Sequence, residues 1–174
     1  MKIGKDCKIS SKVSIYGADQ IEIGDNVRID DFCILSGGSG LKIGSHCHIA
    51  CFAALFAGSG IIIDDFVGLS ARVTLYSESD DYSGESMTNP QVDRELRRKM
   101  EKGTITIGRH AIIGAYSAVM PGVTIHEGAA VGAHSMVKDD LDPWTIYAGI
   151  PAVRIKDRKK DPLDLEKEFM KAHV

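Results

Sequence analysis

The sequence has no apolar run long enough to form a membrane-spanning helix. Its longest uninterrupted apolar run, Ile49 to Ala57, contains nine residues, whereas a spanning helix needs about 18. The first four residues, Met1 to Gly4, do not begin a signal peptide either. We therefore expect a cytoplasmic protein with no membrane partner.

The sequence also has little excess charge of either sign. Lys and Arg total 21 and Asp and Glu total 24, which gives a formal net charge of −3. A nucleic-acid-binding surface normally needs a clear basic excess, so we expect no nucleic-acid partner and favour a small molecule.

Paired cysteine motifs are missing. No C-x-x-C pair occurs among the four cysteines, which are Cys7, Cys33, Cys47 and Cys51. A cytoplasmic protein also keeps its thiols reduced. We therefore expect them to act as small apolar fillers, and not as two disulfides or a zinc site.

Helical periodicity is absent before residue 163, and a different repeat takes its place. The dipeptide Ile-Gly recurs every 20 residues, and aliphatic residues follow each of the first four anchors by six and twelve positions: Ile9 and Ile15, Ile29 and Leu35, Ile49 and Leu55, Leu69 and Leu75. After a break the spacing of six resumes from Ile107 to Val137, with a period of 18. The longer early periods carry extra glycine-containing segments, YGADQIE, SGGSGLK and FAGSGII, where glycine supplies positive φ at a wide corner.

This hexapeptide repeat predicts a triangular parallel β-helix. Three hexads make one three-sided turn, and one turn cannot bury its own apolar side chains. Stacking about six turns, each about 4.8 Å above the last, pairs the backbone groups of neighbouring turns and buries the aliphatic columns. Proteins with this hexad resemble the left-handed parallel β-helix family, so the handedness is implied by that resemblance and runs against the general right-handed rule.

Two segments depart from the repeat. Residues 76–104 form a polar insertion, and insertions of this length inside a compact domain are usually functional. Within it, PQVDRELRRKM is expected to form a short helix. Pro143 and Pro151 stop the repeat near the end, and residues 164–172 read as a short helix with Leu165 and Phe169 facing the body. We thus expect a β-helix domain over residues 1–141 and a C-terminal extension over residues 142–174.

The segment IGAYSAVMPGVTIHEGAAVGAHSMV, followed by IYAGIPAVRIK, resembles the C-terminal half of acetyl-CoA-dependent hexapeptide acyltransferases. The Gly-x-Pro-Ala ending at Gly149 to Ala152 is more specific than the hexads, which γ-class carbonic anhydrases share. The insertion falls where galactoside and maltose acetyltransferases have their acceptor loop. The resemblance implies a homotrimer, with acetyl-CoA in a groove between neighbouring β-helices.

The resemblance also implies which residues line the cofactor groove. Small residues on the C-terminal turns would let a pantetheine arm approach the backbone, although hexads favour small residues for packing as well: Gly114, Ala115, Ser117, Gly132, Ala133 and Ser135. In the basic run that follows, Arg154 and Lys156 are candidates for binding the cofactor's phosphates. A solvated charged face is an equally good explanation of that run.

The insertion lacks a histidine. Galactoside-type enzymes place their catalytic histidine five residues after the anchor that corresponds to Leu75, and this chain has Asp80 there. Asp80, Asp81 and Glu85 are therefore candidates for binding acceptor hydroxyls or sharing the role of base. The alternative is that they form only a charged loop.

The phase of the repeat predicts the direction of the histidines. Because Ile43 and Cys47 point inward, His46 and His48 point outward, with His48 at the corner just before Ile49, and the same count places His110, His126 and His134 on the outside. HIACFAALFAG resembles a segment of nucleotide-aminosugar N-acetyltransferases in which a histidine works at the reacting centre. We take His48 as the first candidate for the catalytic base and His46 as the second; a solvated surface histidine is the alternative for each.

The predicted reaction is direct attack of an acceptor on the acetyl thioester. A base takes the acceptor's proton, and imidazole suits this role near neutral pH. Because an amine is a better nucleophile than a sugar hydroxyl, a loop without the usual histidine favours N-acetylation of a nucleotide-linked amino-deoxy sugar for surface polysaccharide. A sugar O-acetyltransferase of the galactoside or maltose type is the close alternative.

Two alternatives come from other classes of protein. One is a γ-carbonic-anhydrase-like zinc lyase, and the other is a β-helical scaffold without catalytic activity. Within one chain His46 and His110 lie two turns apart, about 10 Å by strand spacing, which is too far for them to share a zinc ion. A zinc site with ligands from neighbouring subunits stays open as an alternative. We therefore expect acetyl-CoA as the co-substrate and no metal.

Overall fold

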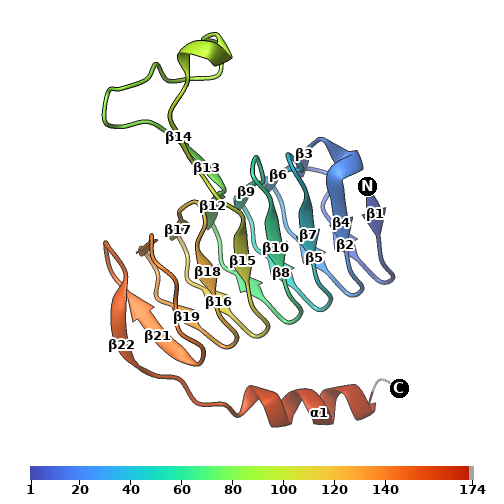
Figure 1. The fold of residues 1–174 in the computed structure, drawn as a ribbon. Helices are drawn as coiled ribbons and strands as arrows, with labels where there is room; N and C mark the ends of the chain where they lie inside the picture. The colour runs from blue at the N-terminus through green and yellow to red at the C-terminus, as the bar shows by residue number, and fades with distance from the viewer. Residues whose placement is uncertain (173–174) are drawn as a thin grey trace.

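The structure is a computed structural model and describes residues 1–172. The chain forms a left-handed parallel β-helix, a three-sided prism with an arm and a C-terminal helix outside it (Figure 1). The fold predicted from the hexads is therefore confirmed. Six turns have all three sides, and Leu141 and β21 begin a seventh by pairing with the turn before.

Each face of the prism is one parallel sheet. The first face has six strands: β1 (Lys2–Ile3), β4 (Ile21–Ile23), β7 (Leu41–Ile43), β10 (Ile61–Ile63), β15 (Ile105–Ile107) and β18 (Thr124–Ile125). The second face has eight: β2 (Lys8–Ile9), β5 (Arg28–Ile29), β8 (His48–Ile49), β11 (Gly68–Leu69), β16 (Ile112–Ile113), β19 (Ala130–Val131), β21 (Thr145–Ala148) and β22 (Val153–Asp157), the last antiparallel. The third face has six: β3 (Ser14–Tyr16), β6 (Ile34–Ser36), β9 (Ala54–Phe56), β12 (Thr74–Tyr76), β17 (Ala118–Val119) and β20 (Met136–Val137).

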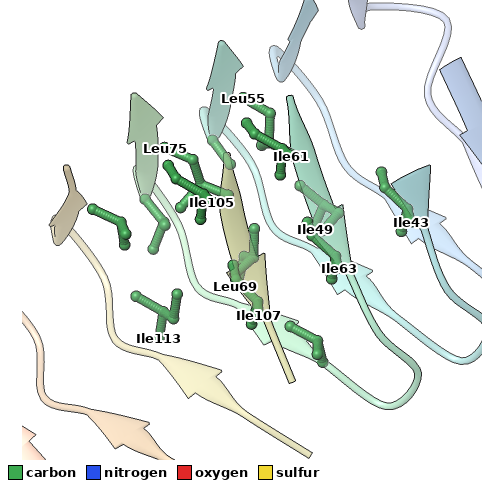
Figure 2. Packing of buried hydrophobic residues seen from close by; sticks show 14 of the residues in the cluster. Ile43, Ile49, Leu55, Ile61, Ile63, Leu69, Leu75, Ile105, Ile107 and Ile113 are labelled. Carbon is green, nitrogen blue, oxygen red and sulfur yellow. The ribbon is translucent and has the colours of Figure 1, made fainter. Parts of the chain in front are cut away.

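The inward residues of the hexads fill the prism. Ile49, Leu55 and Ile61 have no exposed surface, and Figure 2 shows such side chains converging from all three faces. The first turn is the exception, since Ile3 is 47% exposed. No turn lies below it, so its apolar side chains lack half of the neighbours that cover the later ones.

The cysteines fill space, as expected. All four are free, and Cys33 and Cys47 are buried in the core. Burial disfavours the thiolate and raises the pKa of Cys47 to about 11. These two thiols are therefore protonated and unreactive at neutral pH.

Two of the three corners use left-handed backbone at residues other than glycine. His46, Phe66 and His110 have φ of 58°, 58° and 60° and form one corner column, and Phe52 and Tyr116 belong to the other. The wide corner contains positive-φ glycines as predicted, among them Gly17 and Gly60. The sequence reasoning missed the other two columns because side chains other than glycine usually avoid this region.

The insertion is an arm that projects from the prism at the edge between the third and first faces (Figure 1). Its base is an antiparallel pair, β13 (Glu78–Asp80) and β14 (Met100–Lys102). Despite the insertion, β10 and β15 pair in register, with Ile63 beside Ile107. The helix expected in PQVDRELRRKM is reduced to one 3-10 turn, η2 (Arg94–Leu96), because so short a segment cannot offset the cost of helix nucleation without packing.

The chain ends with a strand turn and a helix. A turn with a cis peptide at Ile150-Pro151 joins β21 to β22, and α1 (Pro162–Ala172) follows. The helix begins two residues earlier than predicted, with proline in its first turn. Phe169 contacts the prism as expected, but Leu165 is 60% exposed. No helix within residues 1–172 combines the length and apolar character needed to cross a bilayer.

Candidate functional site

His48 lies on strand β8 of the second face, with its side chain half exposed. The outward direction predicted for it is confirmed, but its predicted place at the corner is wrong: His46 occupies the corner, since the turn residues precede the strand. The His48 Nε2 lies 2.8 Å from Asp30 Oδ2, and Arg28 Nε lies 2.7 Å from Asp30 Oδ1. Bonds from His48 and Arg28 lower the pKa of Asp30, so this carboxyl is ionised at neutral pH.

The pairing with Asp30 determines which nitrogen of His48 can take a proton. An ionised carboxylate only accepts hydrogen bonds, so Nε2 must carry the hydrogen that it donates. The other ring nitrogen, Nδ1, is then the free basic site. Sequence reasoning missed Asp30, although a signal was available: residues 20 apart pair on adjacent strands, and Asp30 follows Arg28, the strand partner of His48, by two positions.

His46 is used in packing. Its ring stacks on Phe66, with centroids 4.8 Å apart, and meets the edge of Phe169 from α1 at 5.2 Å. The left-handed corner at residue 46 turns the ring along the prism and beneath the helix. Within residues 1–172, His46 therefore has an aromatic environment and no carboxylate partner comparable to Asp30.

His110 is on the outer side of the prism, as predicted, but α1 covers it. It is 8% exposed, and its Nε2 donates to Glu166 of α1 at 2.6 Å. Arg109 also donates to Glu166, and through Nη1 to Asp65 at 2.9 Å. The bonds from Arg109 and His110 outweigh burial and lower the pKa of Glu166 to about 2. These hydrogen bonds and ion pairs hold the C-terminal helix against the prism.

The three acidic candidates of the insertion lie along the arm, and each has a partner there. Asp80 Oδ1 accepts from Arg97 at 3.5 Å. Asp81 accepts from the hydroxyl and the backbone N–H of Ser83 and from the backbone N–H of Ser86, and so holds a tight turn. The bond from the Ser83 hydroxyl, followed by that from the Ser83 backbone, lowers the pKa of Asp81. Glu85 is exposed and pairs with Lys99 at 2.7 Å. Of the three, Asp80 has the weakest internal bonds, which leaves it best placed to meet an acceptor.

The small residues of the C-terminal turns are divided between surface and interior. Ser117 and Ser135 are both 2% exposed and bond to the carbonyl of Gly132, so their hydroxyls serve the turns themselves. Ala133 is exposed and Ala115 is half-buried. A Cβ added at Gly114 would lie 2.5 Å from the backbone nitrogen of Ala133, so this glycine is required for the close stacking of turns.

The basic run has two environments. Arg154 and Lys156 are exposed on β22, and Arg154 pairs with Asp157 at 2.5 Å. Arg158 is different, since its Nη1 donates to the carbonyls of His110 and Gly128, and burial lowers its pKa. Arg158 therefore binds the backbone of the corner at His110 and Gly128, while Arg154 and Lys156 lie exposed on β22.

The described part of one chain does not bring these candidates together. His48 lies on the second face, whereas the arm with Asp80 leaves from the edge between the other two faces (Figure 1). The rings of His46 and His110 are separated by the ring of Phe66, 4.8 Å from one and 5.3 Å from the other. Among residues 1–172 there is no group of three or more histidine, cysteine, aspartate or glutamate residues able to hold a metal.

Known proteins share both the sequence and the fold. Residues 104–139 match the family described as bacterial transferase hexapeptide (six repeats). The dTDP-4-amino-4,6-dideoxy-D-glucose acyltransferase of Escherichia coli is 46% identical over 168 residues, which cover 96% of this chain and 87% of that protein. The chain belongs to the hexapeptide-repeat acyltransferase family. The family assignment drawn from the hexads and the Gly-x-Pro-Ala ending is thus confirmed.

Solved structures of this family give the same result. AntD, an N-acyltransferase from Bacillus cereus solved in complex with dTDP-4-amino-4,6-dideoxyglucose and coenzyme A, superposes with a TM-score of 0.95 and 46% identity, covering 98% of this chain and 90% of that chain. The galactoside O-acetyltransferase of Escherichia coli is 38% identical over 74 residues, 41% of this chain and 36% of that protein. This acyltransferase chain therefore shares nearly its whole length with AntD and with the Escherichia coli dTDP-4-amino-4,6-dideoxy-D-glucose acyltransferase, and less than half with the galactoside enzyme.

Proposed function

We propose that the chain transfers an acyl group from acyl-CoA to the amino group of a dTDP-linked 4-amino-4,6-dideoxyhexose. The observation that carries this proposal is the identity of 46% over almost the full chain to an enzyme named for that acceptor. The AntD complexes with dTDP-4-amino-4,6-dideoxyglucose and coenzyme A support it. The product would serve surface polysaccharide synthesis in the cytoplasm.

In this proposal His48 is the general base. The amine nitrogen attacks the thioester carbonyl carbon, the C–S bond breaks, and the proton on nitrogen passes to His48 Nδ1. The imidazolium then returns the proton to the departing CoA thiolate, so no covalent enzyme intermediate forms. Asp30 orients the ring and stabilises its charged form, since it holds the opposite ring nitrogen at 2.8 Å.

Asp80 is the second residue assigned to the acceptor. The AntD structures include variants at a serine and an aspartate ten residues apart in that protein, and Ser70 and Asp80 have this spacing here. Ser83 and Asp93 share the spacing, but both are exposed on the arm. We assign Asp80 to binding the acceptor's neutral amino group, whose N–H can donate a hydrogen bond to the carboxylate.

The cofactor and the assembly complete the proposal. Acyl-CoA would lie in a groove between two chains of a homotrimer, along the C-terminal turns. Of the residues predicted to line it, those with exposed or half-exposed positions remain assigned: Gly114, Ala115, Gly132, Ala133, Arg154 and Lys156. Ser117 and Ser135, being buried, are assigned to support the groove from inside.

The acyl group itself is open to a direct test. Acetyl-CoA is the donor predicted from the sequence, whereas one AntD complex contains 3-hydroxybutyryl-CoA. Turnover of dTDP-4-amino-4,6-dideoxyglucose with each donor, followed by thiol release and mass spectrometry of the product, measures both activity and preference. We expect an amide product with at least one of them.

A sugar O-acetyltransferase is the second candidate function, favoured by the partial match to the galactoside enzyme. The same assay with a galactoside and a maltoside as acceptors separates the two. Turnover of these hydroxyl acceptors, without turnover of the amino sugar, would contradict the N-acyltransferase proposal.

A further inference from the structure

The arm has a partly open cavity of its own. It has a volume of about 500 Å³ and lies between the β13–β14 base and the segment 90–94. Three cationic side chains, Arg94, Arg97 and Lys102, line it together with two carboxylates, Glu78 and Asp93. The cavity therefore has an excess of positive charge in a protein whose net charge is −3.

Arg97 is the unusual member of this set. Its side chain is only 18% exposed, and its one carboxylate contact, Nη2 to Asp80 Oδ1, is long at 3.5 Å. A second contact from Nη2 reaches Met100 Sδ at 3.5 Å, a weak acceptor. Among the side chains that the structure describes, Arg97 Nε is the buried nitrogen or oxygen without a hydrogen-bond partner.

An unpaired buried donor on a cation is costly. Leaving such a donor unsatisfied costs about 1–3 kcal/mol, and more for a charged group, so proteins normally supply a partner. Two of the neighbouring carboxylates are already engaged: Glu78 lies 3.7 Å from Lys102, and Asp80 also accepts from the backbone of Asn89. An anion entering the cavity would supply the missing acceptor once the guanidinium turned toward it.

We propose that this arm cavity binds a phosphate group of one of the two substrates, with Arg97 as its main ligand and Arg94 and Lys102 at its rim. A guanidinium can donate two parallel hydrogen bonds to a phosphate, which a single ammonium cannot. The inference rests on the proposed function, because both dTDP-sugars and CoA carry phosphates. The contact with Asp80 places the phosphate on the same arm as the residue assigned to the acceptor.

The variant Arg97→Gln tests the proposal, with Arg98→Gln as its matched control. Arg98 is the next residue, is exposed and bonds only to the carbonyl of Glu95, so its substitution removes the same charge from the same arm. Binding of dTDP, thymidine, CoA and 3′-dephospho-CoA is measured by calorimetry for both variants and the wild type. We expect Arg97→Gln to weaken one phosphate-bearing ligand about 10- to 100-fold, in line with a hydrogen bond to a charged group.

The four ligands identify the source of the phosphate. If Arg97→Gln weakens binding of dTDP alone, the cavity binds the nucleotide diphosphate. The variant and the wild type should then bind thymidine with the same affinity. If Arg97→Gln weakens binding of CoA but not of 3′-dephospho-CoA, the cavity binds the 3′-phosphate. If it weakens binding of both, the cavity binds the CoA diphosphate. In every case Arg98→Gln should stay within about twofold of the wild type.

Two results would overturn the proposal. If Arg97→Gln binds all four ligands as Arg98→Gln does, while the wild type still acylates the amino sugar, the phosphate site is wrong and the proposed function stands. If the wild type binds neither dTDP nor CoA, the proposed function fails and the phosphate site fails with it.

Discussion

At the scale of the residue, position within the hexad separates histidines that look equivalent in the sequence. His46 occupies a left-handed corner and packs between Phe66 and Phe169, whereas His48, two residues later, stands on a strand and meets Asp30. His110 follows the corner pattern of His46 but is buried by α1. The three rings thus have different environments because backbone geometry and neighbouring turns differ.

The residue-scale prediction concerns the base. We expect His48→Ala to lower kcat/KM by about 10²–10⁴, the usual contribution of general-base catalysis, with dTDP-4-amino-4,6-dideoxyglucose and acyl-CoA as substrates. Asp30→Asn should cost less, about tenfold, because His48 keeps its ring but loses the charged partner of Nε2. The rate of CoA thiol release measures the kcat/KM of both variants.

The control for this prediction is His126→Ala. His126 is exposed and lies at a corner after β18, away from β8, so its removal should leave the rate unchanged. A His48→Ala protein that works within a few-fold of the wild type would remove His48 as the base and leave His46, the second candidate, and Asp80.

At the scale of the element, α1 is held by a small set of contacts. Its residues are mostly exposed, and its attachment depends on Phe169 over the aromatic corner and on Glu166, which meets both Arg109 and His110. Isolated helices of this length are marginal in water. The docking cluster therefore stabilises the helix as well as covering the corner.

The element-scale prediction is an acid-dependent loss of α1 docking. The pKa of Glu166 is lowered to about 2 from a usual value of 4.5, so its stabilising contribution is complete above about pH 4.5 and is lost as the pH falls toward 2. Trp144, the only tryptophan, lies against His110, with centroids 6.1 Å apart. Its fluorescence should therefore change over that pH range.

Substitutions on the helix test the assignment of this transition. Glu166→Gln should lower stability at neutral pH by about 1–3 kcal/mol, since it removes the charge that pairs with Arg109, and should remove most of the fluorescence change. Glu168→Gln, at an exposed position of the same helix, should behave as the wild type. An unchanged acid transition in Glu166→Gln would show that another group controls it.

At the scale of the whole molecule, the separation of the candidates is the main feature. His48 and the arm residue Asp80 belong to different sides of the prism, and the arm projects away from its own β-helix (Figure 1). A second chain can close this distance by placing its β8 under the arm of its neighbour. This separation is the physical reason to expect sites between chains, and the number of three chains comes from the resemblance to hexapeptide acyltransferases.

The whole-molecule prediction is a trimer whose sites are shared. Light scattering should give a mass three times that of the 18.8 kDa chain. Co-expression of His48→Ala and Asp80→Asn chains should recover about a quarter of wild-type activity, because that share of interfaces receives both intact residues in random closed trimers. Each variant alone should remain impaired. Mixed trimers no more active than their parents would contradict a site shared between chains.

The sequence alone predicted much of the prism because the hexad spacing specifies which residues point inward. Every inward position is specified by its distance from the previous anchor, so the faces, the buried column of Ile49 and Leu55, and the outward direction of His48 could be read directly. The insertion was visible as a break in that spacing. The family followed from the Gly-x-Pro-Ala ending together with the hexads.

Only the tertiary structure decided which contacts are made by the segments outside the hexapeptide repeat. The cover of His110 is Glu166, more than 50 residues away. The arm cavity around Arg97 depends on how the loop folds back on β13 and β14. The hexapeptide repeat predicts the positions of residues within its own turns. The helix and the arm lie outside the repeat, so only three-dimensional packing brings their residues into these contacts.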